Sequence, residues 1–152
     1  MPKPSENLAA LDISLPIPPT VAGSYAPVVR TGDILYVSGN LPVVDGVLVN
    51  PGTVGDTVDI AAANHAARVC AINILANAAS YLGSVDRIKK ILKVTGYVAS
   101  AFGFSEQPKV VDGASDLFLA VFGENGRHAR SAVGVSALPR GASVEVEAII
   151  AI

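Results

Sequence analysis

Three charged side chains stand out in the apolar C-terminal stretch HARSAVGVSALPRGASVEVEAIIAI, which starts at His128. Arg130 lies at the head of one strand-like run. Glu145 and Glu147 occupy alternate positions of the next run, so they share a face. A guanidinium is a planar fork of donors that binds both oxygens of a carboxylate at once. These residues therefore indicate part of a pocket for a small carboxylate. In the alternative reading, Arg130 pairs with a glutamate across the sheet and holds a subunit interface.

The two runs are expected to pair as a closing antiparallel hairpin around a short loop that contains proline. Strand side chains alternate between faces, so we set the register by matching apolar positions, which pairs Val135 with Val146. That register predicts that Arg130 lies on the same face as the two glutamates. Ala132 and Gly134 are small neighbours on that face, so there would be room for a ligand beside the guanidinium.

The remaining chain alternates strand and helix patterns. From Thr57 to Leu82 alanine dominates, and apolar residues recur at helical spacing. A second helix is predicted from Gln107 or Pro108 to Phe122. Strands are predicted at 34–38 and 88–100, with a hairpin at 43–49 that turns at its Asp-Gly pair. The order β-β-α-β-α-β-β predicts an α+β sandwich with two helices packed on one face of a sheet.

The length of 152 residues favours one domain. Residues 1–21 are rich in proline and polar side chains, so we expect an N-terminal extension ahead of a single domain at residues 22–152. The N-terminus has no apolar segment typical of a signal peptide, and no run is long enough for a membrane span. One cysteine, Cys70, fits a reducing compartment, which makes the cytoplasm the expected location.

Composition narrows the choice of partners. Hydrophobic residues make up 51% of the chain and charged residues only 16%, against about 25% charged in typical globular domains. The surplus apolar surface indicates a homo-oligomer, because obligate interfaces resemble a core cut in half. A net charge of −2 and the absence of tryptophan argue against a nucleic-acid partner, which needs basic patches and stacking aromatic residues.

The closing stretch resembles the C-terminal signature of the RidA/YjgF family, also called L-PSP endoribonuclease-like: an Arg-Ser before a strand, a Leu-Pro turn, then a Glu-x-Glu-Ala strand. Tyr25 followed by LYVSGNLPV (35–43) is similar to the family's tyrosine and its Ser-Gly-Gln-Ile-Pro segment. The helix segment AINILANAASYLG also resembles the family, and the likeness covers residues 22–152. It implies a chorismate-mutase-like fold, a homotrimer with clefts between subunits, and hydrolysis of 2-imino or 2-enamino acids to 2-oxo acids and ammonia. The resemblance implies neither a metal nor an organic cofactor.

The resemblance also implies roles for individual residues. Arg130 matches the arginine that binds the substrate carboxylate, and Glu145 matches a glutamate associated with the attacking water. Ala132 replaces the family's cysteine, but it keeps the backbone carbonyl that orients the substrate nitrogen. Tyr25 matches the tyrosine near the cleft, and Ser38-Gly39 matches the loop that lines it.

Other residues leave alternatives open. His128 lies two residues before Arg130 and either touches the ligand or is an exposed loop histidine. Two histidines and one cysteine give no metal-ligand spacing, so no metal is expected. Three function classes remain: an imine or enamine deaminase, a non-catalytic binder of small carboxylates, and a ribonuclease. The acidic charge balance disfavours the ribonuclease.

Overall fold

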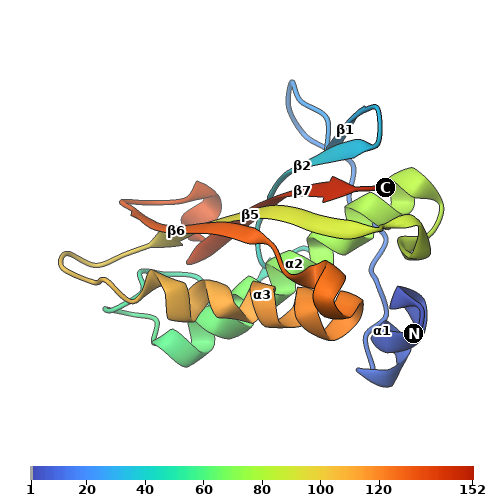
Figure 1. The fold of residues 1–152 in the computed structure, drawn as a ribbon. Helices are drawn as coiled ribbons and strands as arrows, with labels where there is room; N and C mark the ends of the chain where they lie inside the picture. Colours follow the sequence, from blue (N-terminus) through green and yellow to red (C-terminus); the bar gives the residue numbers. More distant parts are fainter. Residues whose placement is uncertain (1) are drawn as a thin grey trace.

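Two long helices lie across one face of a five-stranded sheet in the computed structural model, which describes residues 2–152 (Figure 1). This arrangement confirms the predicted α+β class. The elements are α1 Pro4–Ala10, β1 Val28–Thr31, β2 Ile34–Asn40, β3 Val43–Val44, β4 Val47–Leu48, α2 Ile60–Leu82, η1 Val85–Arg87, β5 Lys90–Ala99, α3 Gln107–Phe122, η2 Gly123–Gly126, β6 Ala129–Val135, η3 Pro139–Gly141 and β7 Val144–Ala151.

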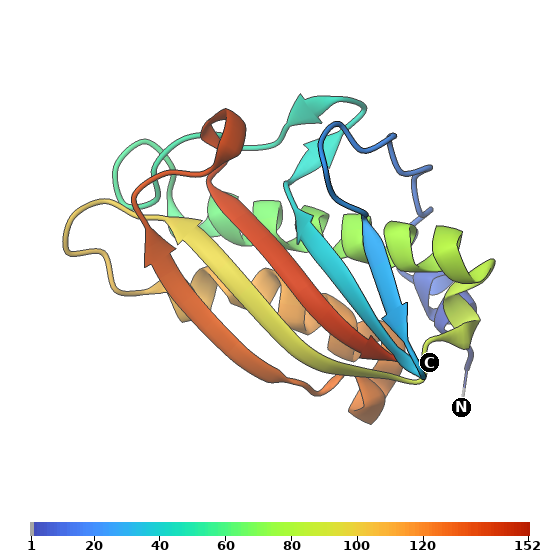
Figure 2. The ribbon, with the colours of Figure 1, turned by 90° about the horizontal axis from the view of Figure 1, so that it is seen from above.

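The strand order in the sheet is β1-β2-β7-β5-β6, as Figure 2 shows. All neighbours are antiparallel except β5 and β6, which are parallel. The prediction of a closing hairpin is therefore wrong: β7 pairs with β2 and β5, and β6 pairs with β5. The segment β5-α3-β6 is a crossover unit, and a helical crossover returns the chain parallel to its first strand. The loop around η3 then carries β7 past β5 into the middle of the sheet.

This topology separates two side chains that were expected to share a face. Within β7 the residues Val144, Val146, Ala148 and Ile150 are all buried under the helices, so Glu145 lies on the opposite, open face. Arg130 is the register partner of Val94, which is fully buried on the helix side of β5. Arg130 therefore points toward the helices. The alternation within each strand was predicted correctly, but the face assigned to β6 relative to β7 was wrong.

The helices begin and end where side-chain and backbone chemistry favours it. The Asp59 carboxylate accepts a hydrogen bond from the Ala62 N–H at 2.8 Å, so α2 starts at Ile60 and not at the predicted Thr57. Gly83 ends it in the left-handed conformation, with φ 84°. The predicted turn at 45–46 is confirmed, since both of its residues have positive φ. No helix within residues 2–152 combines the length and the apolarity needed to cross a bilayer.

The N-terminal segment contains a helix that the sequence pattern did not predict. Helix α1 packs beside α3, and Leu8 is only 3% exposed within the shared core. The Ser5 N–H and hydroxyl both donate to the Asp86 carboxylate at 2.8 Å, and the Asn7 amide donates to the Val121 carbonyl. Residues 4–10 therefore belong to the folded body. The domain boundary at residue 22 stays a prediction.

The contact between α2 and α3 generates a stability prediction. Gly113 on α3 is buried, and a Cβ built there would overlap the backbone carbonyl of Asn64 on α2. Helix propensity alone would make Gly113→Ala stabilising by about 1 kcal/mol. Because the obstacle is backbone, we expect overpacking to win and the free energy of unfolding to fall by about 1–3 kcal/mol.

Urea unfolding at a fixed protein concentration measures this loss. Asp116→Ala, on the exposed side of the same helix, is the control and is expected to change stability by less than about 0.5 kcal/mol. A stabilised Gly113→Ala protein would show that the two helices separate easily, contrary to this packing.

Candidate functional site

Arg130 is anchored on α3 by one corner of its guanidinium. Its Nη1 donates to the Asp112 carboxylate at 2.7 Å and to the Ser115 hydroxyl at 3.1 Å. Within residues 2–152, Nε and Nη2 make no hydrogen bond, and the side chain is 24% exposed. Arg130 thus forms an internal ion pair, as in the alternative reading. Its partner, however, is an aspartate of a helix and not the glutamate of the sheet that this reading named. One edge of the fork stays available.

His128 extends the same network. Its Nδ1 lies 2.6 Å from the Gly126 carbonyl, which only accepts, so this nitrogen carries the proton. Its Nε2, 2.9 Å from the Ser115 oxygen, then accepts from the serine hydroxyl. Burial lowers the pKa of His128, and the positive charge of Arg130 adds to that effect. The half-buried imidazole is therefore neutral at neutral pH and serves as the end of a chain that begins at Arg130.

Glu145 lies on the other face of the sheet, against Gly39 of β2. Its side chain covers the Gly39 backbone so closely that a Cβ there would overlap the carboxylate. Burial raises the pKa of Glu145, and the nearby Glu147 raises it further. Glu147 in turn accepts a 2.6 Å hydrogen bond from the Tyr97 hydroxyl, and this bond is the main reason why the pKa of Tyr97 rises to about 12.

The loop that carries Tyr25 is tied to the same strand. The Ser38 hydroxyl donates to the Ala26 carbonyl at 2.6 Å, and the Ser38 N–H donates to the Pro27 carbonyl at 3.0 Å. Tyr25 itself is 59% exposed. The structure thus groups Ser38 and Gly39 with Glu145, and it fastens the tyrosine loop to their strand.

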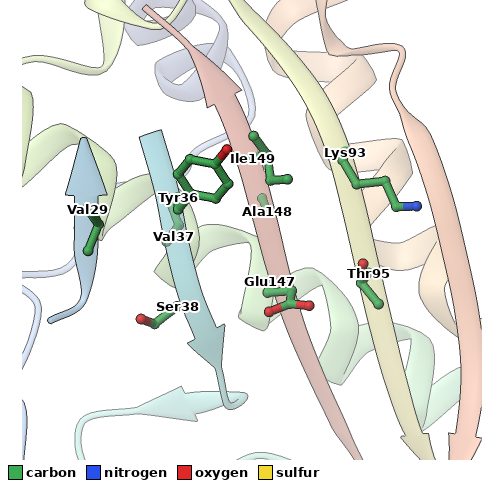
Figure 3. A pocket seen from close by; sticks show the side chains of 9 residues that line it. All are labelled: Val29, Tyr36, Val37, Ser38, Lys93, Thr95, Glu147, Ala148 and Ile149. Atoms are coloured by element: carbon green, nitrogen blue, oxygen red, sulfur yellow. The ribbon is translucent and has the colours of Figure 1, made fainter. Parts of the chain in front are cut away.

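A shallow groove of about 340 Å³ runs over the open face of the sheet (Figure 3). Polar groups from three strands line it, among them Ser38, Thr95 and Glu147, with Lys93 at one side. Arg130 does not line this groove, because it lies under the opposite face. The groove is therefore not the complete carboxylate pocket that the sequence predicted.

The predicted site residues fall into two groups on opposite faces of one sheet. Arg130 and His128 lie on the helix side, together with Ala132, which packs against the core. Ser38 and Gly39 lie on the strand beside Glu145, and Tyr25 lies in the loop that is fastened to Ser38. Sequence reasoning missed Asp112 and Ser115, whose spacing of three residues puts them on one side of a helix. That they face Arg130 follows only from the parallel pairing of β6 with β5.

Metal-binding and thiol chemistry have little support among residues 2–152. No group of three or more histidine, cysteine, aspartate or glutamate side chains in this part of the chain could hold a metal ion. Cys70 is fully buried under β7, 3.8 Å from the Val144 carbonyl, and burial raises the pKa of its thiol. A thiol without thiolate character is a poor nucleophile, so Cys70 acts as a small core residue.

Fold and site together place this chain among the chorismate-mutase-like α+β proteins. A family model described as "YjgF/chorismate_mutase-like, putative endoribonuclease" matches residues 5–148. The chain belongs to this YjgF, or RidA-like, family, as the resemblance had implied.

Three relatives illustrate the similarity. The chain is 43% identical over 145 residues to Protein TCP17 of Trypanosoma cruzi, covering 95% of this chain and 91% of that protein. It is 29% identical over 143 residues to a 2-iminobutanoate/2-iminopropanoate deaminase of Dermatophagoides farinae, covering 92% and 94%. The crystal structure of protein Atu1372 from Agrobacterium tumefaciens, described as of unknown function, superposes with a TM-score of 0.92 at 44% identity, covering 98% and 92%.

The environment of Glu145 generates a pH prediction. A carboxyl whose folded pKa lies above its ordinary value near 4.5 stabilises the fold below that value and loses this contribution as pH rises through the folded pKa. Glu145→Gln removes the ionised, desolvated form. We therefore expect the stability of the variant, relative to the native chain, to increase as pH rises from about 4 to 7.

Urea unfolding across this pH range is the measurement. Glu124→Gln is the control, because hydrogen bonding to Arg127 lowers the pKa of Glu124 and reverses the sign of the expected trend. Parallel trends for the two variants would contradict the assignment of a desolvated carboxylate at position 145.

Proposed function

We propose that this chain hydrolyses 2-imino or 2-enamino acids to 2-oxo acids and ammonia, at a site completed by a second copy of the chain. The observation that carries the proposal is the state of the Arg130 guanidinium. Its Nη1 is fixed by two hydrogen bonds, whereas the N–H groups of Nε and Nη2 make no hydrogen bond within residues 2–152. Two parallel N–H donors on one edge of a fixed guanidinium match the two oxygens of a carboxylate.

The ion pair with Asp112 is compatible with this role. The Asp112 side chain is 49% exposed, and ion pairs open to solvent contribute only about 0–1 kcal/mol. Such a pair orients the arginine without neutralising every donor. A ligand that binds bidentately to the remaining edge makes charge-assisted hydrogen bonds worth more than that pair.

Imine hydrolysis needs positioning and a water more than a strong nucleophile, because the C=N carbon is already electrophilic. Arg130 would hold the substrate carboxylate, and the Ala132 carbonyl would accept a hydrogen bond from the imino nitrogen. Glu145, whose pKa is raised by burial, would orient or deprotonate the attacking water, because a general base works best when its pKa approaches the operating pH.

One chain cannot bring these groups together, since Arg130 and Glu145 lie on opposite faces of its sheet. A second subunit must contribute one half of the site. We propose a homotrimer, in which Tyr25 closes the cleft from a neighbouring subunit. Exposed apolar side chains on the open face support burial there: Val29 is 55% exposed, Tyr36 48% and Val133 43%.

The relatives favour the deaminase over its competitors. The Dermatophagoides farinae protein is named as an imine deaminase and aligns over nearly the whole chain. A non-catalytic binder of small carboxylates would use the same arginine, so only turnover distinguishes it. A ribonuclease, as in the family description, is disfavoured by the net charge of −2.

The single buried cysteine supports a cytoplasmic location.

Substitution of Arg130 tests the proposed function. An amino-acid oxidase generates the imine in the assay, and the protein's acceleration of 2-oxo acid release is measured. We expect Arg130→Ala to lower kcat/KM by at least about 100-fold, since the loss removes two charge-assisted hydrogen bonds. Arg130→Lys should also be poor, because a point ammonium cannot reproduce the fork.

Arg127→Ala is the matched control, because Arg127 lies three residues away and, among the described residues 2–152, pairs only with the exposed Glu124. It should retain full activity. An unchanged rate for Arg130→Ala would refute the assignment. Saturable binding of a 2-oxo acid without turnover would replace the enzyme by the non-catalytic binder.

The proposed assembly predicts that a charge on the open face dissociates the oligomer. Tyr36→Lys places an ammonium in the apolar surface near Val29, and we expect a loss of trimer mass in light scattering together with a loss of imine hydrolysis. Tyr81→Lys is the control, since Tyr81 is 50% exposed at the end of α2, on the helix layer. If both variants keep the native mass, the open face is not the interface.

A further inference from the structure

The helix α3 contributes to the site a carboxylate whose charge the proposed function does not use. Asp112 lies 2.7 Å from Nη1 of Arg130, and Ser115, one turn later, holds the same nitrogen through its hydroxyl. The serine is in turn held by the neutral His128. These contacts fix which edge of the guanidinium faces outward, and they place a negative charge beside the cation that would receive the substrate.

The charge of Asp112 affects different ligands differently. A monocarboxylate that binds to the free edge is attracted by the nearby guanidinium more strongly than it is repelled by the more distant aspartate. A second carboxylate on the same ligand gains little, because the pair of Arg130 and Asp112 has almost no net charge at longer range. It also approaches an anion that is only partly screened by solvent, since Asp112 is 49% exposed.

The other charged groups near this part of α3 do not compensate. Lys109 is bound to Glu106 in the first turn of the helix, and Asp116 adds a further negative charge one turn after Asp112. His128 is joined to the same network through Ser115, and burial lowers its pKa and favours the neutral form. Within residues 2–152, no second cation is bonded to this network to receive another carboxylate.

We propose that Asp112 is a specificity-determining residue that restricts the site to monocarboxylates with uncharged side chains and excludes dicarboxylates. The inference rests on the proposed function, because it assumes that Arg130 receives the substrate carboxylate. In this arrangement Asp112 supplies the charge that discriminates, while Ser115 supplies only the position of the guanidinium.

The test compares two 2-oxo acids of equal chain length, 2-oxopentanoate and 2-oxopentanedioate, as stable products of the proposed reaction. Calorimetry on the full chain measures the ratio of their dissociation constants. We expect the native chain to bind the monocarboxylate more tightly by about tenfold or more. Asp112→Asn keeps an oxygen that accepts from Nη1 but removes the charge, and it should reduce this preference by about three- to tenfold.

Two further variants separate charge from position. Asp116→Asn makes the same chemical change one turn away and should alter the ratio by less than about twofold, because Asp116 has no contact with Arg130. Ser115→Ala loosens the guanidinium and should weaken both ligands while the ratio stays the same. The ratio is insensitive to partial unfolding, which would lower both affinities together.

Each outcome decides one of the two proposals. If the native chain binds 2-oxopentanoate through Arg130 but Asp112→Asn leaves the ratio unchanged, or Asp116→Asn shifts it equally, the specificity inference is overturned and the proposed function stands. If neither acid binds the native chain, or binding survives Arg130→Ala, the proposed function is overturned and the specificity inference with it.

Discussion

The burial of one face of β7 determines the rest of the architecture. Val144, Val146, Ala148 and Ile150 alternate along this strand, and all are at most 3% exposed under the two long helices. A strand so fully covered belongs in the middle of the sheet, where both of its edges find hydrogen-bond partners. Its residues between these positions, including Glu145, must then lie on the open face. The position of the acidic half of the proposed site is a direct consequence of this packing.

The position of β6 follows from the same constraint. With β7 paired to β5 on one side, the only free edge of β5 is the outer one, and the crossover through α3 brings β6 there in parallel. Residue 130 is then in register with buried Val94 and faces the helices. An arginine at an edge strand can reach solvent around that edge, which explains how it can be anchored to α3 and still be partly exposed.

Local patterns in the sequence predicted most elements but not their pairing. The alanine-rich stretch, Gly83 and the Asp45-Gly46 turn act over a few residues, so their outcomes could be derived without knowledge of the fold. Strand pairing is a long-range choice. Two adjacent apolar strands fit a hairpin as well as they fit a pair separated by β5, and alternation alone cannot distinguish these arrangements.

The candidate residues could therefore be chosen one by one from the sequence, but their arrangement in space could not. Arg130 and Glu145 came from type and spacing and from a family signature, whereas Asp112 and Ser115 needed the tertiary contact between α3 and β6. Helix α1 was missed for a different reason. Its seven residues have weak helical propensity by themselves, and the helix is stabilised by Leu8 in the core and by hydrogen bonds to distant parts of the chain.

The charge distribution gives a physical reason for a site shared between subunits. The open face carries Glu145 and Glu147, and burial and mutual repulsion already disfavour the ionised form of Glu145. A carboxylate substrate would be repelled by these two glutamates, and Lys93 at one side of the groove offsets that repulsion only in part. Delivered on Arg130 from another subunit, the carboxylate would be held by charge-assisted hydrogen bonds from the guanidinium, and these bonds offset the repulsion even though the Arg130–Asp112 pair has almost no net charge at longer range. In the proposed mechanism, assembly thus brings the guanidinium that binds the anionic substrate to the face that carries the glutamates, which a single chain cannot do.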